Sequence, residues 1–313
     1  MAALLSVVMP TYNGEQFLAA ALESVRQQFA DDIEFIIVDD GSSDSTLDII
    51  RGFSQKLPLR LITPGRIGNW VAATNIGLRE ATGEWASFLH QDDLWLPGRI
   101  AKLRAAIENA KGALILHNAK FIGPNGQTLG PSTCPLPAGD VPSDLFIERL
   151  LIQNFIALPS PVFRRSIVLE SGGLDESLWF SADWDLWLRL GTRGPVHFID
   201  QTLAAFRVHP ASQTASRSVQ PREWHQQLST VLERHIKAWT ATGSRRNSVE
   251  RAAEFSIAIN SALASASRRI SSSFFPLISK FLALGPSGWQ RYMRDSRIVQ
   301  RVKPRLMVSL MKQ

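Results

Sequence analysis

Cysteine is almost absent from this sequence, and its scarcity excludes several classes of protein. The 313 residues contain one cysteine, Cys134. No disulfide can therefore form within the chain, and no cysteine cluster is available for a structural zinc ion or a dithiol redox pair. A chain without disulfides fits a reducing compartment, so we expect a cytoplasmic protein, with a peripheral position on the cytoplasmic membrane face as a further option.

Long apolar runs are missing as well. The most apolar stretch, residues 274–284, contains Pro276 and Lys280 and is shorter than the about 20 residues that a membrane-spanning helix needs. The first ten residues carry no basic side chain and end at Pro10, which does not fit a signal peptide. Glycine and proline, at 20 and 17 residues, are not in excess, and 45% of positions are apolar. We therefore expect a globular chain rather than a fibrous or disordered one.

Charge is unevenly distributed along the chain. Residues 1–213 hold 17 Lys and Arg against 23 Asp and Glu, a net charge of −6, whereas residues 214–313 hold 17 against 5, a net charge of +12. The change in charge predicts a boundary near residue 213, with the chemistry in the acidic part and a docking surface in the basic part. From the charge alone, either a nucleic acid or an anionic membrane could be the partner of the basic part.

The first hundred residues alternate between short β-rich runs and segments with helical periodicity, which is typical of a parallel sheet covered by helices. Two acidic pairs, Asp39 with Asp40 and Asp92 with Asp93, directly follow predicted strands. Ligands of open α/β sheets bind outside the carboxyl ends of the strands, so we expect a site at this rim. The predicted strands are 4–9, 33–38, 59–62 and 85–89, and the predicted helices are 15–28, 46–53 and 71–81.

The remaining sequence predicts mixed structure followed by helices. The passage 123–142 is rich in glycine and proline, and we expect a long loop there. Beyond residue 221 the chain is predicted to be almost wholly helical. The other expected elements are helices 96–109 and 183–190 and strands 114–117, 196–199 and 203–208.

Carboxylates at strand ends commonly hold a divalent cation or accept hydrogen bonds from a base or a sugar. A sugar nucleotide would use both, because a cation can neutralise its diphosphate as that group departs. The alternative is structural: Asp39 and Asp40 could cap the next helix, and Asp92 and Asp93 could begin a turn. Two such pairs on one rim favour a ligand site.

Several motifs occur together in the sequence. They are Val7-Val8-Met9-Pro10-Thr11-Tyr12, Val38-Asp39-Asp40-Gly41-Ser42, Asn75-Ile76-Gly77, Leu89-His90-Gln91-Asp92-Asp93, Gly172-Gly173-Leu174-Asp175-Glu176, Asp183-Trp184-Asp185-Leu186-Trp187 and Phe206-Arg207-Val208-His209. Their order and spacing resemble those of the inverting glycosyltransferases of family 2, over about residues 4–213. The resemblance implies an α/β fold of the A type, a Rossmann-like mixed sheet flanked by helices, with residues 1–213 as the nucleotide-sugar-binding and catalytic domain. The charge and helical pattern of residues 214–313 predict a basic helical extension.

The resemblance also implies roles for single residues. Asp40 would accept a hydrogen bond from the imide nitrogen of the base, Asp92 would bind Mn²⁺ or Mg²⁺, and Asp93 would touch the donor sugar or orient the loop. His90 stands where the family usually has the first aspartate of an Asp-x-Asp motif, and it is either a ligand or an ordinary paired histidine. The residues expected to contact the nucleotide are Pro10, Thr11, Tyr12, Asp40, Asp93, Arg207 and His209, with His209 also a candidate metal ligand.

Asp183 matches the family's catalytic base, which would take a proton from the acceptor hydroxyl. The glutamate that usually precedes it is Ala182 here, and the structural alternative is a carboxylate that simply stabilises a helix N-terminus. Trp184 is expected to present its ring to the acceptor sugar, whereas the helical spacing of Trp187 favours the core. Thr74 stands where the family often has arginine, and Arg66 could supply that cation or simply be solvated.

These observations lead to one expected function and two alternatives. The expected function is metal-dependent transfer of a sugar from a nucleotide diphosphate, UDP favoured, to a hydroxyl of a glycan or lipid-linked saccharide, in cell-surface polysaccharide synthesis. The alternatives are a sugar-phosphate nucleotidyltransferase and an inactive nucleotide-sugar-binding module. Residues 268–313 combine basic and aromatic side chains and are expected either to dock on an anionic membrane or to form a solvated bundle or oligomer contact. Nucleic acid is not the expected partner, because no nucleic-acid-binding motif accompanies the charge.

Overall fold

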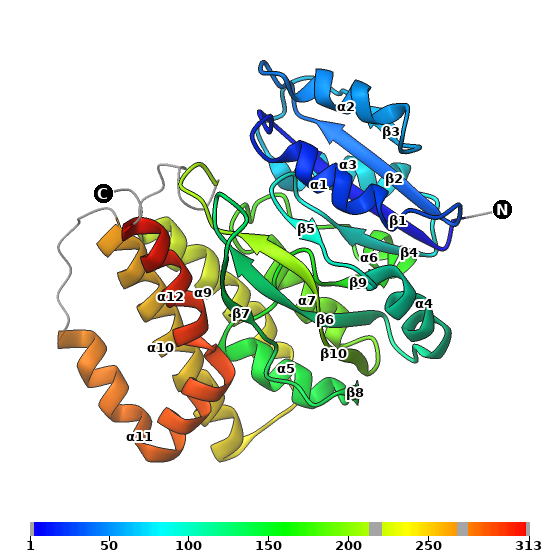
Figure 1. Ribbon diagram of the computed structural model, residues 1–313. Helices are drawn as coiled ribbons and strands as arrows, with labels where there is room; N and C mark the ends of the chain where they lie inside the picture. Colours follow the sequence, from blue (N-terminus) through cyan, green and yellow to red (C-terminus); the bar gives the residue numbers. More distant parts are fainter. Residues whose placement is uncertain (1–2, 213–220, 268–274, 311–313) are drawn as a thin grey trace.

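The computed structural model describes residues 3–212, 221–267 and 275–310. Its centre is one mixed sheet with the strand order β3-β2-β1-β4-β9-β6-β10-β5, to which β7 adds beside β6 and β8 beside β10 (Figure 1). The expected α/β sheet flanked by helices is thus confirmed. The strands are β1 Leu5–Thr11, β2 Ile33–Asp39, β3 Arg60–Ile62, β4 Trp85–Phe88, β5 Leu94–Trp95, β6 Leu114–Ile122, β7 Thr128–Ser132, β8 Gly139–Val141, β9 Val162–Arg164 and β10 Val196–Arg207.

The first four strands run parallel, with β1 between β2 and β4 and β3 beside β2. The helices that follow them are α1 Leu18–Arg26, α2 Thr46–Ser54, α3 Trp70–Glu80 and α4 Arg99–Asn109. Parallel strands need crossover helices, which is why this half of the chain alternates between strand and helix. The carboxyl ends of β1, β2 and β4 therefore lie at one edge, followed there by Tyr12, Asp40 and the 89–93 segment.

Alternation of side chains along each strand divides the core between the two faces of the sheet. Val7 and Met9 of β1 belong to a cluster that α1, α2 and α4 cover, for example with Leu22 and Leu103. Val8, which points the other way, belongs to a larger cluster with α3 and with α5 Ser143–Ile152 and α7 Ala182–Gly191. α7 thereby lies on the face opposite α1, and a short helix, α6 Arg165–Glu170, precedes it.

The prediction of a long loop over 123–142 is wrong, because this passage contains β7 and β8. β7 pairs antiparallel with β6 only and lies off the main path of the sheet. Pro131 within it has no N–H to give to a ladder, which an edge strand tolerates. Similarly, the two strands predicted at 196–199 and 203–208 form one strand, β10, with register shifts between Ile199 and Ala204. β7 was not predicted from the sequence because Gly130 and Pro131 are residue types typical of loops.

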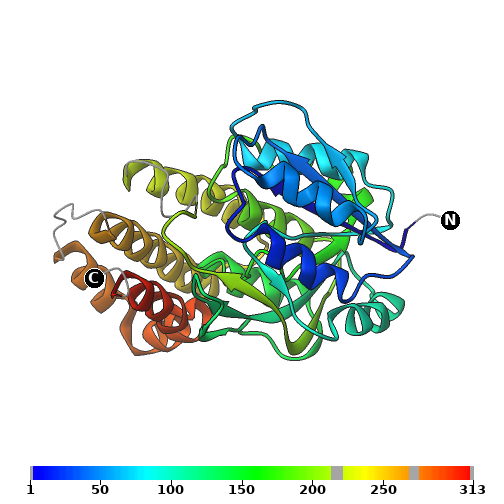
Figure 2. The same ribbon diagram turned by 45° about the horizontal axis from the view of Figure 1, so that its top comes forward.

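The described residues of the C-terminal segment form helices joined by short connections, which agrees with the expected, almost wholly helical structure. Its helices are α9 Pro221–Ala238, α10 Gly243–Ser267, α11 Phe275–Ser296 and α12 Ile298–Leu310. They gather on the side of the molecule away from β1, β2 and β3, in both views (Figures 1 and 2). Residues of α9, α10 and α11, among them Val231, Phe255 and Tyr292, share one apolar cluster with α5 and α7, so the basic segment packs directly on the acidic part of the chain.

Ion pairs join these two oppositely charged parts. Glu148 of α5 pairs with both Arg245 of α10 and Arg291 of α11, and Arg234 of α9 pairs with Asp175 and with Asp185 of α7. A share of the basic charge therefore neutralises the protein's own carboxylates. None of the helices in the described residues is long and apolar enough to span a membrane.

Candidate active site

The end of β1 and the loop after β2 form the first part of the site. Pro10 and Thr11 are buried in β1, and the Thr11 hydroxyl donates to Asp39 at 3.1 Å. Asp39 also accepts from the amide and hydroxyl of Ser42 at 2.9 and 2.6 Å. These bonds fix the loop, so Asp39 has a structural role. Tyr12, just beyond β1, is 36% exposed and is the member of the predicted base pocket whose side chain faces solvent.

Asp40 lies beside Tyr12 with its carboxylate already hydrogen-bonded. The Arg66 guanidinium pairs with Oδ2, and the amide of Gly68 donates to both oxygens at 3.1 and 2.9 Å. The amide of Ile67 donates to Oδ1 as well. Asp40 therefore holds the segment after β3 in this conformation. Arg66, which was expected either to supply the missing cation or to be solvated, is its ionic partner.

Gln91 links the end of β1 to the acidic loop after β4, a role that sequence analysis missed. The amide of Tyr12 donates to Gln91 Oε1 at 2.8 Å, and Gln91 Nε2 donates to the carbonyl of Tyr12 at 3.0 Å. Gly14 approaches the same side chain so closely that a Cβ there would lie 2.5 Å from Oε1. The predicted nucleotide residues and the predicted metal ligand thus belong to one connected loop cluster. Gln91 sits inside a motif that the sequence already marked, but nothing in that motif assigns it this contact.

Asp92 and His209 come together although 117 residues separate them. His209 Nε2 lies 2.8 Å from Asp92 Oδ2, because β10 carries His209 to the same rim as the 89–93 loop. Burial opposes ionisation of Asp92, but the hydrogen bond from His209 and the charges of the nearby imidazoles outweigh it, so the pKa of Asp92 is lowered. The pair joins a carboxylate and an imidazole, both of which ligate divalent metals.

Asp93 links the acidic loop to the end of β10. Its side chain is buried, and Oδ1 accepts from the amide of Arg207 at 2.9 Å. Burial, and next the neighbouring charge of Asp92, raise the pKa of Asp93 well above its usual range. Oδ2 is buried without a partner among the described atoms. Of the two roles expected for Asp93, these contacts favour orientation of the loop over contact with the donor sugar.

Arg207 is likewise a structural cation here. Its Nε donates to the carbonyl of Asp92 at 2.8 Å, and its Nη1 donates to the carbonyls of Gly123 and Pro124 at 2.9 and 3.1 Å. The guanidinium also lies over the ring of Phe17. With these contacts and almost complete burial, Arg207 holds three loops together. The resemblance implied a contact with the nucleotide, but the guanidinium does not extend toward one.

His90 packs against Trp70 at the start of α3, with ring centroids 5.1 Å apart. Burial lowers the pKa of His90, and its Nε2 is buried without a partner in the described structure. Within residues 3–212, 221–267 and 275–310, no group of three or more histidine, cysteine, aspartate or glutamate side chains is arranged to hold a metal ion. Asp92 and His209 nevertheless supply two suitable donor atoms, and Mg²⁺ in phosphate sites often takes only one or two protein ligands.

Asp183 lies in the first turn of α7. Asn154, just after α5, donates from Nδ2 to Asp183 Oδ2 at 2.8 Å. Burial raises the pKa of Asp183 to about 6, and hydrogen bonds from the amide of Trp184 and from Asn154 limit the rise. A carboxyl with a pKa near the working pH can accept a proton and later release it. No local pattern in the sequence points to Asn154, because its partner lies 29 residues away.

A short chain of contacts connects Asp183 to the acidic loop. The indole N–H of Trp70 donates to the carbonyl of Trp179 at 2.7 Å, and Trp70 packs on His90. Trp179 precedes α7, and the indole N–H of Trp179 donates to the carboxylate of Glu223 in α9 at 2.7 Å. The segment before Asp183 is thereby held against the N-terminal end of α3, next to the His90–Asp93 loop.

The prediction that Trp184 offers its ring to an acceptor sugar is wrong. Trp184 is 3% exposed, and its indole N–H donates to the carbonyl of Leu150 at 2.8 Å. Its ring packs in the apolar cluster between α5 and α7, which leaves no face for a ligand. Trp187 is fully buried, so its expected place in the core is confirmed.

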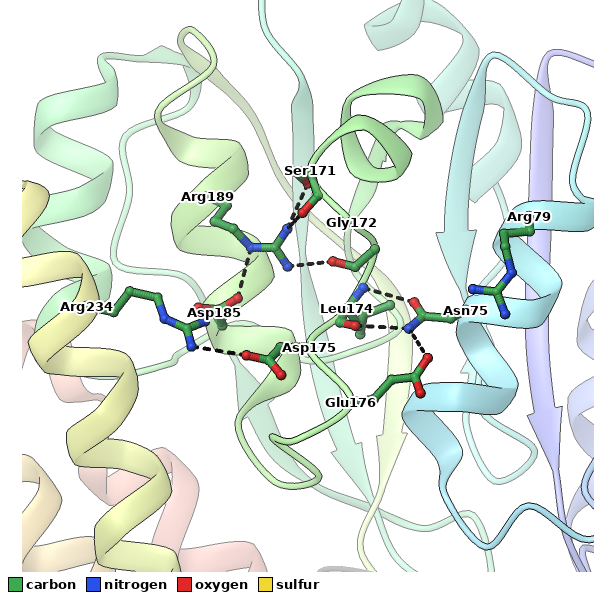
Figure 3. Close-up of a pocket in the computed structure, with 11 residues that line it drawn as sticks. Asn75, Arg79, Ser171, Gly172, Leu174, Asp175, Glu176, Asp185, Arg189 and Arg234 are labelled. Carbon is green, nitrogen blue, oxygen red and sulfur yellow. Dashed lines mark hydrogen bonds and ion pairs between the residues drawn. The ribbon is translucent and has the colours of Figure 1, made fainter.

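A cavity of about 430 Å³ lies elsewhere, between α3, the 171–176 segment, α7 and α9 (Figure 3). Four of its charged side chains form ion pairs: Arg189 bonds Asp185 at 2.9 Å, and Arg234 bonds Asp175 at 3.1 Å. Asn75 donates to the carbonyl of Leu174 at 2.9 Å. None of the predicted catalytic or nucleotide residues lines this cavity, and its polar groups serve to hold the 171–176 segment on the fold.

Solved structures with the same fold bind nucleotide sugars. The chain is similar to S. aureus TarS in complex with UDP-GlcNAc, with a TM-score of 0.70 and 18% identity over 92% of this chain and 81% of that one. It is also similar to the mannosyltransferase PcManGT of Pyrobaculum calidifontis in complex with GDP-Man and Mn²⁺, with a TM-score of 0.56 and 14% identity over 100% of this chain and 89% of that one. At these identities the likeness establishes the fold, which is that of A-type glycosyltransferases.

Sequence relatives agree with the fold. An uncharacterised glycosyltransferase of Rickettsia typhi is 28% identical over 75% of this chain and 73% of its own length. A PGL/p-HBAD biosynthesis glycosyltransferase of Mycobacterium bovis is 31% identical over 60% of this chain and 70% of its own length. The family model "Glycosyl transferase family 2" matches residues 6–163, half of the chain. That match covers the β1 end and the acidic loop with Asp92, and the protein therefore belongs to glycosyltransferase family 2.

Proposed function

We propose that this protein is an inverting glycosyltransferase that moves a sugar from a nucleotide diphosphate to a hydroxyl of an acceptor. Family membership supports transfer of a glycosyl group. The observation that carries the mechanism is the environment of Asp183, a half-buried carboxylate oriented by Asn154, with its pKa raised to about 6. Such a group is ionised at neutral pH and still basic enough to take a proton from an alcohol as the alcohol attacks.

In this proposal the reaction is one displacement. Asp183 accepts the proton of the acceptor hydroxyl while the hydroxyl oxygen forms a bond to the anomeric carbon of the donor. The bond between that carbon and the diphosphate breaks at the same time, and the nucleoside diphosphate leaves with the electron pair. Attack opposite the leaving group inverts the configuration at the anomeric carbon. Asn154 keeps Asp183 aimed by its 2.8 Å hydrogen bond.

We propose that Asp92, with His209 beside it, holds Mn²⁺ or Mg²⁺. Their donor atoms lie 2.8 Å apart, and the lowered pKa of Asp92 keeps its carboxylate ionised. A bound divalent cation would neutralise charge on the departing diphosphate. Thr11, Tyr12 and Asp40 would receive the nucleoside next to it, since Gln91 joins Tyr12 to this loop.

The donor is proposed to be a UDP-sugar. Uracil carries an imide N–H that can donate a hydrogen bond to a carboxylate such as that of Asp40. The uracil ring can also stack on Tyr12, the exposed aromatic residue at this edge. Guanine also carries a ring N–H, so a GDP-sugar is the closest competitor. One structure with this fold holds UDP-GlcNAc and another holds GDP-Man, which keeps both in the test below.

The acceptor is proposed to be a glycan or a lipid-linked saccharide presented at a membrane, within cell-surface polysaccharide synthesis. α11 and α12 expose large apolar side chains, and Lys303 lies exposed among them. Lys280, Arg291 and Arg294 instead pair with carboxylates of the protein, while Arg268 and Arg269 lie outside the described residues. An anionic bilayer would cover apolar groups and attract the remaining basic charge. The exposed side chains are Ile278, Phe281, Leu282, Met293, Val299, Leu306 and Leu310.

The donor and the reaction type can be tested together. A panel of UDP-, GDP-, CDP- and ADP-sugars, with and without Mn²⁺, should raise the melting temperature only for the true donor, because a ligand that binds the native state stabilises it. With an acceptor, release of nucleoside diphosphate supports transfer. Release of pyrophosphate would support a nucleotidyltransferase, and binding without release of either would support an inactive binding module.

Membrane docking has its own test. The full chain should co-sediment with vesicles containing anionic lipid, and the double variant Leu306→Ser/Leu310→Ser should do so less. The matched control is Leu263→Ser, which changes an exposed leucine of α10. Equal sedimentation of the wild type and the double variant would remove α12 from this role.

A further inference from the structure

Arg66 lies flat against the exposed ring of Tyr12. Its Cζ is 3.7 Å from the ring centroid, while its guanidinium pairs with the carboxylate of Asp40. The Arg66 side chain is 49% exposed, whereas that of Asp40 is only 6% exposed. A guanidinium is planar and delocalised, and it stacks on aromatic rings much as a base does. One side chain thus covers the aromatic ring and the carboxylate that the proposed function gives to the nucleobase.

The carboxylate of Asp40 has no oxygen left over in this arrangement. Oδ2 accepts from Arg66 and from the Gly68 amide, and Oδ1 accepts from the amides of Ile67 and Gly68. An imide N–H of a base can approach Oδ2 only where the Arg66 Nη1–H now lies. The base and Arg66 therefore need the same hydrogen-bond acceptor as well as the same ring face.

The segment that carries Arg66 is held mainly at this point. Residues 64–68 are exposed, and in the part of the chain that the structure describes their hydrogen bonds all go to Asp40. Gly65 and Gly68 have φ values of +88° and +77°, a region that glycine enters without steric cost. The segment joins β3 to α3, so Arg66 can swing away while both elements stay in place.

We propose that Arg66 occupies the nucleobase position and that the donor binds by displacing it. The inference rests on the proposed function, which places the base on Tyr12 and Asp40. Arg66 is then a built-in competitor that lowers affinity for the nucleoside part of the donor and leaves its diphosphate part unaffected. A base with a ring N–H replaces the lost Arg66 hydrogen bond at Asp40. A base that presents a ring-nitrogen lone pair there does not, so the device favours uracil and guanine over cytosine and adenine.

The test compares UDP with inorganic pyrophosphate, which has no base. Dissociation constants for both are measured by calorimetry with Mn²⁺ for the wild type, Arg66→Ala and Arg66→Lys. The effect of the changed protein charge on binding is removed by comparing the ratio of UDP affinity to pyrophosphate affinity. We expect Arg66→Ala to raise this ratio about threefold to tenfold, the scale of one stacked guanidinium and one partly exposed ion pair. Arg66→Lys, which keeps the charge without the flat group, should raise it less.

Arg60→Ala is the matched control, because Arg60 is an exposed arginine of β3 that pairs with Glu80. It should leave the ratio unchanged. An unchanged ratio in Arg66→Ala would show that Arg66 does not occupy the base position, and a lower ratio would show that it binds the base instead. If UDP and GDP fail to bind to any of these proteins while the melting temperature shows them folded, the proposed base pocket itself fails and this inference falls with it.

Discussion

Replacing Asn154 by alanine should move the pH dependence of transfer. Asn154 donates the side-chain hydrogen bond to Asp183 that stabilises its charged form, and burial has already raised the pKa of Asp183 to about 6. A hydrogen bond to a charged group contributes about 1.5–3 kcal/mol, and one pKa unit corresponds to about 1.36 kcal/mol. Because water can replace part of the lost bond, we expect the pKa of Asp183 to rise by about one unit.

The direction of the shift in the pH profile follows from the role of Asp183 as a base. Transfer requires ionised Asp183, so kcat/KM should fall as the pH drops through about 6 in the wild type and about one unit higher in Asn154→Ala. The assay is nucleoside diphosphate release under acceptor-limited conditions, from about pH 5 to pH 9. The control is Asn109→Ala, because the Asn109 side chain donates to the carbonyl of Ala105 within α4. It should not shift the profile.

An Asn154→Ala profile with lower activity at every pH but an unchanged midpoint would refute this reasoning. It would mean either that the ionisation of Asp183 does not control the rate of transfer or that Asn154 affects only the stability of the fold. The midpoint separates these cases from the expected result, since a purely structural defect scales the whole profile.

Three further outcomes follow from the contacts described above. Trp184→Phe should leave the KM for acceptor unchanged and lower the free energy of unfolding by about 1 kcal/mol, because it removes a buried hydrogen bond to Leu150; a raised KM with unchanged stability would restore Trp184 to the acceptor site. Glu148→Gln should destabilise the fold by about 1–3 kcal/mol in urea unfolding, because Arg245 and Arg291 lose a shared, nearly buried partner; an unchanged midpoint would show that this link does not hold α10 and α11. Chelation with EDTA should abolish transfer, and added Mn²⁺ or Mg²⁺ should restore it, whereas Asp92→Ala should not be restored; transfer that persists in EDTA would remove the metal from the proposal.

The strands and helices of the first hundred residues could be predicted because their patterns are local. Strands such as β2 are short apolar runs, and the amphipathic spacing of Leu18, Leu22 and Val25 predicts α1. The predicted helix 15–28 is longer than α1, which begins at Leu18, because the preceding residues form a turn fixed by side-chain bonds to Gly14 and Glu15. β7 could not be found in this way, since Pro131 makes an edge strand look like a loop.

The places of the candidate site residues in the fold could be predicted, whereas most of their contacts could not. Strand-end position and motif order placed Tyr12, Asp92 and Asp183 correctly on loops and helix ends. The partners Gln91 and Asn154 came only with the structure, because hydrogen bonds between distant segments leave no periodic signal in the sequence.

Burial was the other source of error. Arg207 was predicted to contact the nucleotide, and Asp93 to touch the donor sugar or orient the loop. A buried cation and a buried carboxyl are also a stable way to join loops when backbone groups satisfy them. For Trp184 the signal was present: Leu186, Trp187, Leu188 and Leu190 surround α7 with apolar side chains, as in a helix buried on most sides. That pattern predicts an interior tryptophan rather than a sugar platform.

The most direct test of the account is Asp183→Asn, which keeps the size of the side chain and removes its basicity. UDP binding with Mn²⁺, measured by calorimetry, should stay close to that of the wild type, while transfer to acceptor should fall by about 10²–10⁴-fold, the contribution of a positioned base. A variant that binds UDP and transfers sugar at the wild-type rate would contradict the assignment of Asp183 and the mechanism built on it.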